Sequence, residues 1–418
     1  MVGTRHLWRG CGVNYFSTIN FVIGKFSQRE WLVGVNVSCI GDINVQVGIG
    51  QFFLFMVFLI CASIDCAGNL SVEIASNGTL ERSPFTIKNV QEHSMGTYLY
   101  DYLDIKVHDW IQKRDFKNIW IVGEYSRGDG ISQTEKKEKI FNYQRPTAKI
   151  QGDDLYVQCF PGIDYVQHYA SLISSFLALH QRNFNNVHYL LPNESVCWEV
   201  LLRSNLMEVP HGDVAILGYG LDILAGSNQH WEGKGSFSWV TQVINHRKVV
   251  FIGCRHSYWG DIGGRIVTIL AKMGYQRVIF VGKLGTMRSE IAPNTLLATG
   301  DTSFIHGEII HWKNCFDFMK NDPGIVFGNH IHVASVMFET KNWVKKHKNY
   351  DFVDPEIGYM AKAAIARGIE FSFLHIISDN LSKKYEENLS NERGKKIIEK
   401  RHVLLNKIKS IIEDSMLF

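Results

Sequence analysis

The feature that most constrains this sequence is an alternation between short apolar runs and amphipathic segments, which begins near residue 85. Apolar runs of strand length, separated by segments with helical spacing, predict strands joined by crossover helices. In the first part of this region the strand candidates are 118–125, 154–160 and 186–192, and the helix candidates are 164–182 and 193–205. This order predicts an α/β layer with a parallel sheet.

The alternation continues to the end of the chain. The strand candidates of this second part are 213–220, 248–256, 277–287, 295–304, 329–338 and 370–380, and the helix candidates are 263–275, 358–368 and 391–416. We expect the third of these strands to break at Gly282 and Gly285. The sequence therefore predicts two α/β units, 85–204 and 205–418, and neither contains a GxGxxG or GxxxxGK(S/T) cofactor fingerprint.

Composition excludes some classes of partner. The length of 418 residues favours more than one domain. A net charge of +3, from 44 basic and 41 acidic residues, is too small to indicate a nucleic-acid partner. The eight cysteines are widely spaced and form no CxxC pair or zinc-binding pattern. We therefore expect free thiols, no metal site and a reducing compartment, with the cytoplasm slightly favoured.

Residues 1–84 fit neither α/β unit. They contain an unbroken apolar run, 52–62, which is short for a membrane span because a span needs about 20 apolar residues. A secretory signal would place such a run directly behind basic residues at the chain start. Three interpretations stay open: a signal-anchor that leads to membrane attachment or secretion, a buried element, or an upstream extension outside the natural product.

Polar and charged residues follow the ends of several strand candidates in 205–418. They are Arg255 and His256, the loop Gly282–Lys283–Leu284–Gly285, Asp301, the pair Asp354 and Glu356, and Asp379. In an open α/β sheet, ligands gather outside the carboxyl ends of the strands. The sequence therefore predicts a small-molecule site at this edge of the sheet.

Two segments of this half resemble the nucleoside phosphorylase and nucleosidase superfamily. The segment 249–301 is similar to the family pattern of a glycine turn, a helix, a strand ending in VGTxG and the motif GDxVIATG. The segment FVDPEIGYMAKAAIARGIEFSFLHIISDN, 352–380, is similar to VxMExAAxxxxAxxxGIxxxxxxxISD. The resemblance covers about half of the chain, roughly 210–415. It implies a mixed, twisted sheet flanked by helices, a nucleoside or nucleotide ligand, a homo-oligomer and no metal or redox cofactor.

The resemblance also implies roles for individual residues. Asp379 matches the family aspartate that donates a proton or hydrogen bond to the purine base, and Ser378 beside it can tune that carboxyl group. Glu356 matches the family glutamate that accepts hydrogen bonds from the ribose 2′- and 3′-hydroxyls. The structural alternatives are that Asp379 caps the next helix and that Glu356 is a first-turn glutamate favoured by the helix dipole.

The sequence departs from the family at the phosphate site. Phe280 and Lys283 stand where phosphorylases usually carry a phosphate-binding Arg and a hydroxyl residue. Lys283 could meet an anion, pair with Glu290 or Asp301, or block the pocket. Arg255 is a further candidate anion contact, with a surface arginine as the equal alternative. These losses favour hydrolysis slightly over phosphorolysis, with phosphate still possible as a co-substrate.

A second departure lies in the segment HVASVMFETKNW, which retains His332 of the family pattern HxGxxxSxDxFY. Phe338 and Thr340 stand where Ser and Asp usually occur. The predicted function is cleavage of the N-glycosidic bond of a purine nucleoside or nucleotide, with the loop from Gly282 to Gly285 against the ribose. The alternative is a catalytically weak nucleoside- or nucleotide-binding or sensing module, and a third hypothesis is a secreted or stored protein that keeps only the fold.

Overall fold

The structure is a computed structural model that describes residues 83–387 and 392–417 in full and, before them, the backbone of six strands. The chain divides into two compact units, Met1–Ala75 and Ser76–Phe418. In the first unit β1 (Val2–Thr4), β2 (Ile19–Lys25), β3 (Trp31–Ser38) and β4 (Asp42–Val47) form an antiparallel sheet, and β5 (Ser63–Ile64) pairs with β6 (Leu70–Ser71). The apolar run 52–62 lies outside the described residues.

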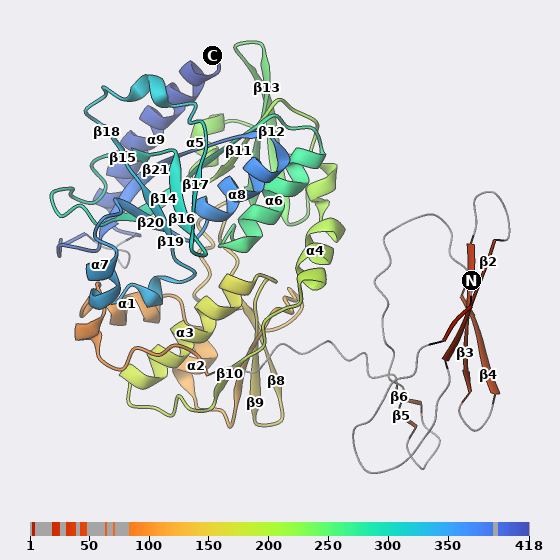
Figure 1. Cartoon of the computed structure of the whole chain (residues 1–418). Coiled ribbons are helices and arrows are strands. Elements are labelled where there is room, and N and C mark those ends of the chain that lie inside the picture. Colours follow the sequence, from red (N-terminus) through yellow and green to blue (C-terminus); the bar gives the residue numbers. More distant parts are fainter. Residues whose placement is uncertain are drawn as a thin grey trace. The chain divides into compact units, whose positions relative to one another are not determined.

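The second unit begins with a four-stranded sheet, the smaller of its two sheets (Figure 1). Its order is β10 (Val187–Tyr189), β7 (Ile119–Val122), β9 (Asp154–Gln158) and β8 (Thr147–Gln151). The first three strands are parallel, as predicted, and β8 adds an antiparallel hairpin that the sequence analysis missed. The helices of this part are η1 (Val90–Glu92), α1 (Tyr98–Asp104), α2 (Asp109–Lys113), α3 (Ile163–Leu179), α4 (Glu194–Arg203) and η2 (Asn205–Glu208).

The larger sheet has eleven strands and mixes parallel with antiparallel pairs, so the predicted fold class is confirmed. Its main path is β12 (Phe237–Ile244), β13 (Arg247–Cys254), β11 (Val214–Gly218), β14 (Arg277–Thr286), β20 (Phe352–Asp354), β19 (His330–His332), β16 (Thr302–Ile305) and β17 (Glu308–His311). In addition, β21 (Glu370–Asn380) pairs with β14 and β15 (Leu297–Thr299), and β15 pairs with β18 (Ile325–Phe327). The helices are α5 (Leu221–Ala225), α6 (Asp261–Lys272), η3 (Asp317–Met319), η4 (Val336–Phe338), α7 (Lys341–Lys346), α8 (Ile357–Arg367) and α9 (Lys395–Ser415).

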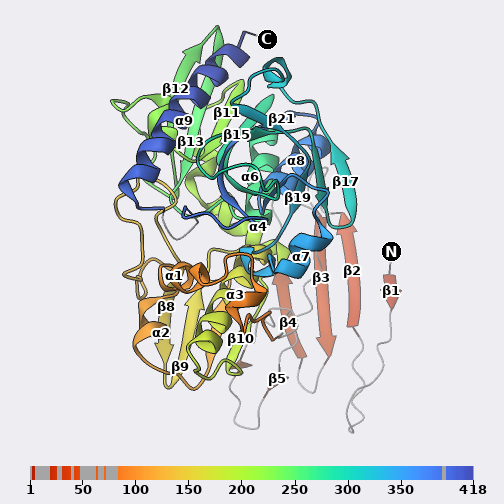
Figure 2. The ribbon, with the colours of Figure 1, turned by 90° about the vertical axis from the view of Figure 1, so that its left-hand side faces the viewer.

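Helices cover both faces of the larger sheet because side chains alternate along its buried strands. In β14, Val278 and Phe280 belong to one core with α6 and α8, whereas Ile279 and Val281 belong to another with α5 and α9. The first core continues into the smaller sheet and α3. In the view of Figure 2, α3 and the smaller sheet lie together, on one side of the larger sheet and its helices. The two sheets therefore share a core, and the division at 204/205 stays a prediction.

Three strand predictions need correction. β14 does not break at Gly282; it runs on to Thr286 with a register shift between Leu284 and Gly285. Gly282 instead allows the side chain of His375 to approach the strand closely, since a Cβ at Gly282 would lie 2.5 Å from Nε2 of His375. The range 295–304 forms two strands, β15 and β16, on either side of Gly300, and they pair with different partners. The range 329–338 is a strand only in its first part and ends in η4.

Gly218, the last residue of β11, offers a test of this packing. Its φ of +115° is unfavourable for other residues, and a Cβ there would lie 1.9 Å from the carbonyl oxygen of Val281. We expect Gly218→Ala to lower the free energy of unfolding, measured with urea, by about 2 kcal/mol or more. Gly96→Ala is the matched control: φ there is +56°, but no atom lies within 4 Å of the new methyl group. Equal decreases in the free energy of unfolding of the two variants would show that the contact with Val281 does not affect stability.

Candidate active site

A cavity of about 620 Å³ lies where the two parts of the second unit meet. Its lining comes from the carboxyl ends of β11, β14, β20 and β21, from the start of α9, and from α1, α3 and the β7–β8 loop of the smaller part. The cavity is of the size that small-molecule ligands occupy. It lies at the edge of the larger sheet where the sequence places the candidate site residues.

Asp379 lines this cavity at the end of β21. The strand pairing sets it directly opposite Gly285 of β14, and Ser378 Oγ donates a hydrogen bond of 2.9 Å to Asp379 Oδ1. Burial raises the pKa of Asp379, although this hydrogen bond and the nearby cations Lys283 and Arg401 oppose the shift. A carboxyl group with a raised pKa retains its proton nearer neutral pH, which suits a general acid.

Glu356 lines the same cavity immediately before α8. Asp354 Oδ1 accepts hydrogen bonds from the backbone N–H of Glu356, at 2.9 Å, and of Ile357, at 2.8 Å, and so forms the helix start. Burial, with the negative charge of Asp354, raises the pKa of Glu356 well above its usual value. A neutral carboxyl group presents one O–H donor and one acceptor oxygen, whereas the sequence analysis expected an acceptor only.

Two buried histidines shift the pKa of Asp354 in the direction opposite to that of Glu356. His330 Nε2 lies 3.1 Å from Asp354 Oδ1, and His375 Nε2 lies 3.4 Å from Asp354 Oδ2. Burial opposes ionisation, yet the contacts with both histidines keep the pKa of Asp354 below its usual range. Sequence reasoning missed both histidines, since each lies within an apolar strand and nothing in its neighbourhood marks it.

Lys283 also lines the cavity, but its partner differs from those considered from the sequence. It forms an ion pair with Glu392, and its ammonium lies 5.2 Å from the centre of the Tyr219 ring. Glu290 instead pairs with Arg288, and Asp301 accepts a hydrogen bond from Thr302. Burial lowers the pKa of Lys283 to about 7, although Glu392 opposes the shift.

The structure does not bring Arg255 and His332 to this cavity. Arg255 follows β13, and its backbone N–H and carbonyl bond to Ser236 and Gln144. His332 Nε2 lies 3.3 Å from Asp164 Oδ2, and its ring packs against Tyr359. Gly282, Lys283, Gly285, Glu356, Ser378 and Asp379 do meet in the cavity.

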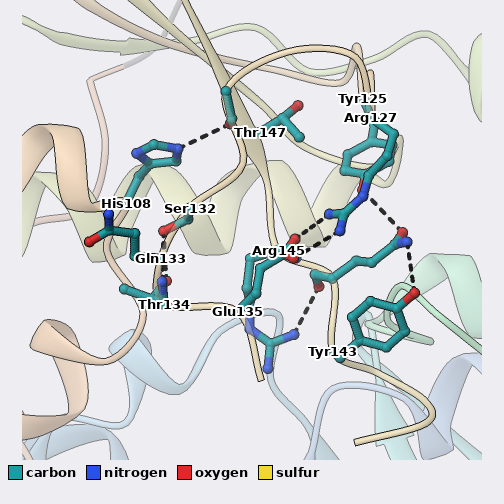
Figure 3. A network of polar contacts seen from close by, with 12 residues as sticks. His108, Tyr125, Arg127, Ser132, Gln133, Thr134, Glu135, Tyr143, Arg145 and Thr147 are labelled. Atoms are coloured by element: carbon teal, nitrogen blue, oxygen red, sulfur yellow. Dashed lines mark hydrogen bonds and ion pairs between the residues drawn. The ribbon is translucent and has the colours of Figure 1, made fainter. Parts of the chain in front are cut away.

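Several lining residues from the smaller part were not anticipated. The β7–β8 loop carries Lys136, Lys139 and Arg145 to the cavity, and a polar network holds the loop in place (Figure 3). At its centre, Glu135 accepts hydrogen bonds from Arg127 Nη2 at 3.0 Å and from the backbone N–H of Arg145 at 3.2 Å. The sequence shows the run EKKEK in a polar loop, but nothing in the sequence placed it at the same cavity as Asp379.

Comparison with known proteins gives no matching family model. Among curated proteins, Oxidoreductase cns1 of Cordyceps militaris is 27% identical over an alignment of 182 residues, and the match covers 38% of this chain and 23% of that protein. The chain therefore matches less than a quarter of the length of this relative.

Solved structures match about half of the chain. The 5′-methylthioadenosine/S-adenosyl homocysteine nucleosidase of Campylobacter jejuni is 17% identical with a TM-score of 0.38, and the match covers 49% of this chain and 99% of that one. Futalosine hydrolase of Helicobacter pylori is 16% identical with a TM-score of 0.36, covering 49% and 97%. Purine nucleoside phosphorylase of Schistosoma mansoni is 10% identical with a TM-score of 0.35, covering 48% and 89%.

Two further observations concern the described residues alone. No helix in the described part of the chain is long and apolar enough to cross a membrane. Within the same residues, no group of three or more His, Cys, Asp and Glu side chains is arranged to hold a metal ion.

Proposed function

We propose that this chain cleaves the N-glycosidic bond of a purine nucleoside or nucleotide. The observation that carries the proposal is the meeting of Asp379 and Glu356 in one cavity, with the raised pKa of each carboxyl group. These are the two residues that match the acid and the ribose anchor in the motifs of the sequence. One carboxyl group would act at the base and the other at the sugar.

In the proposed reaction, Asp379 protonates the leaving base. The bond between C1′ of the ribose and the base nitrogen breaks, and its electron pair goes to the base together with the Asp379 proton. The oxygen of a water molecule bonds to C1′ and releases a proton to the Asp379 carboxylate. General acid catalysis of this kind contributes about 10² to 10⁴ in rate. Glu356 would hold the 2′- and 3′-hydroxyls, donating to one and accepting from the other.

Water is favoured as the nucleophile because the residues at the family's phosphate position are unsuited to a free anion. Phe280 is an apolar ring in contact with Tyr258 and His375. Lys283 is already paired with Glu392. The nearby hydroxyl of Thr286 donates to the carbonyl of Asp351, outside the cavity lining.

The test is release of free base by the purified full chain from a panel of purine nucleosides and nucleotides, followed by chromatography with and without phosphate. Release without phosphate supports hydrolysis, and release only with phosphate would make the protein a phosphorylase. Ligand-induced thermal stabilisation without any release would contradict the enzyme and favour a binding or sensing module.

The rate of base release should fall as the pH rises through the raised pKa of Asp379. Asp379 acts only in its protonated form, whose fraction decreases as the pH passes its raised pKa. Lys283, with a pKa of about 7, also loses its charge as the pH rises. The effects of the two groups are separated by comparing the pH profiles of kcat/KM for the wild type and for Lys283→Arg. In this variant residue 283 stays charged, so a remaining fall in rate is due to Asp379. A rate that climbs steadily with pH in both proteins contradicts Asp379 as the acid.

A further inference from the structure

The proposed reaction leaves several cations of the cavity without a role. Lys106 follows α1, Lys139 lies in the β7–β8 loop, Arg145 precedes β8 and Arg401 lies on α9, and all four line the cavity. We call these four residues the basic cluster. Three of them belong to the smaller part, outside the segment that resembles the nucleosidase motifs.

The carboxylates Glu392 and Glu138 of the cavity form their direct ion pairs with cations outside the basic cluster. Glu392 is engaged by Lys136 and Lys283, and Glu138 pairs with Arg393 at 3.2 Å. Among the described residues, no member of the basic cluster forms an ion pair with a carboxylate. Arg145 donates instead to the backbone carbonyls of Asn142 and Gln144, at 3.2 and 2.9 Å.

Arg401 is the most deeply buried member of the basic cluster whose hydrogen bonds are incomplete. Its side chain is 2% exposed, and its Nε donates to Asn294 Oδ1 at 2.7 Å. Its Nη2 is buried and has no hydrogen-bond partner among the described residues. A buried N–H group of a charged side chain without a partner is costly, and the guanidinium fork matches phosphate oxygens.

The members of the basic cluster also repel one another. Burial lowers the pKa of Lys139 to about 8 against the attraction of Glu392, and Lys136, Arg145 and Arg401 lower it further. Burial raises the pKa of Glu339 well above its usual value, which weakens the compensating charge that this carboxyl group can supply. Asp222, in the first turn of α5, is a further acidic residue of the lining. An anion inside the cavity would relieve this repulsion.

We propose that the basic cluster binds the phosphate group of a nucleotide, so that the substrate of the proposed reaction is a nucleotide rather than a nucleoside. This inference rests on the proposed function for the identity of the base and sugar site. A phosphate ester is favoured over free phosphate because Lys283, at the family's phosphate position, is already paired, and the basic cluster is built mainly from the smaller part.

The test is binding, which does not depend on turnover. Isothermal titration of the full chain would use adenosine, adenosine 5′-monophosphate, and adenosine together with inorganic phosphate. We expect the monophosphate to bind at least about ten-fold more tightly than adenosine, because a hydrogen bond to a charged group contributes that much. Lys106→Gln and Lys139→Gln should each remove most of this advantage while adenosine binds as before.

Matched variants keep the result interpretable. Lys149→Gln changes an exposed lysine of β8 away from the cavity and should leave both affinities unchanged. Lys106→Arg and Lys139→Arg keep the charge and should restore nucleotide binding, which a folding defect would not allow. Equal affinity for nucleoside and nucleotide would overturn the inference, and so would an advantage that free phosphate reproduces. Nucleotide binding without base release would leave the inference standing and overturn the proposed function.

Discussion

Replacing Asp379 with Asn should lower the rate of base release by a factor of about 10² to 10⁴ while changing ligand affinity only a few-fold. Asn has nearly the shape of Asp and can still hydrogen-bond to the base, but it cannot give up a proton to the leaving group. The neighbouring Ser378 hydroxyl, which donates to Asp379 Oδ1, retains an acceptor in the variant. The loss should therefore appear in kcat, measured by chromatography of the released base, and little in KM.

The control for this experiment is the same substitution at a remote position. Asp153 lies exposed in the turn between β8 and β9, so Asp153→Asn should keep the full rate. Retention of more than a tenth of the wild-type rate by Asp379→Asn would exclude Asp379 as the main acid. A rise in KM with an unchanged kcat in Asp379→Asn would show that Asp379 only binds the substrate. Thermal unfolding of both variants shows whether either substitution disturbs the fold.

The sequence could predict Asp379 and Glu356 because local patterns mark both. One carboxylate ends an apolar strand, and the other comes just before a helix. Both positions lie at the edge of a sheet whatever the details of packing. In the structure, β14 pairs in parallel with β21, and this pairing places Gly285 beside Asp379. Residues at strand ends are the part of this site that periodicity can locate.

The basic cluster could not be predicted in the same way. Lys106 and Lys139 lie in loops whose positions depend on how the smaller sheet packs against the larger one. His330 and His375 are separated by more than a strand and helix, and only the tertiary fold brings both to Asp354. For Arg255 the error is the opposite one. It follows a strand end and was expected at the site, but the structure places it outside the cavity lining. Contacts between distant segments leave no periodic signal in the sequence.

Asp261 joins the two parts through a buried carboxylate. At the start of α6 its carboxylate accepts hydrogen bonds from the backbone N–H groups of Ile163, at 3.0 Å, and Asp164, at 3.1 Å, at the start of α3. It also forms an ion pair with Arg265, which in turn contacts Glu194 of α4. Asp261 and Arg265 are each only 6% exposed.

We expect Asp261→Ala to lower the free energy of unfolding by about 3 to 5 kcal/mol, because it leaves Arg265 buried with one partner fewer and the α3 start without its acceptor. Urea unfolding measures this change. Glu199→Ala removes the i,i+4 partner of Arg203 on the surface of α4 and should change stability by less than about 1 kcal/mol. The two variants differ in burial, not in the type of ion pair.

A double variant distinguishes the charge from the packing. In Asp261→Ala with Arg265→Met, no buried cation remains, so part of the lost stability should return. No recovery would mean that the hydrogen bonds to the start of α3, rather than the stranded arginine, account for the loss. Since α3 lines the cavity together with β14 and β21, a weaker junction should also reduce nucleotide binding. Stability and affinity are thus expected to fall together in Asp261→Ala, whereas Asp379→Asn separates them from the rate.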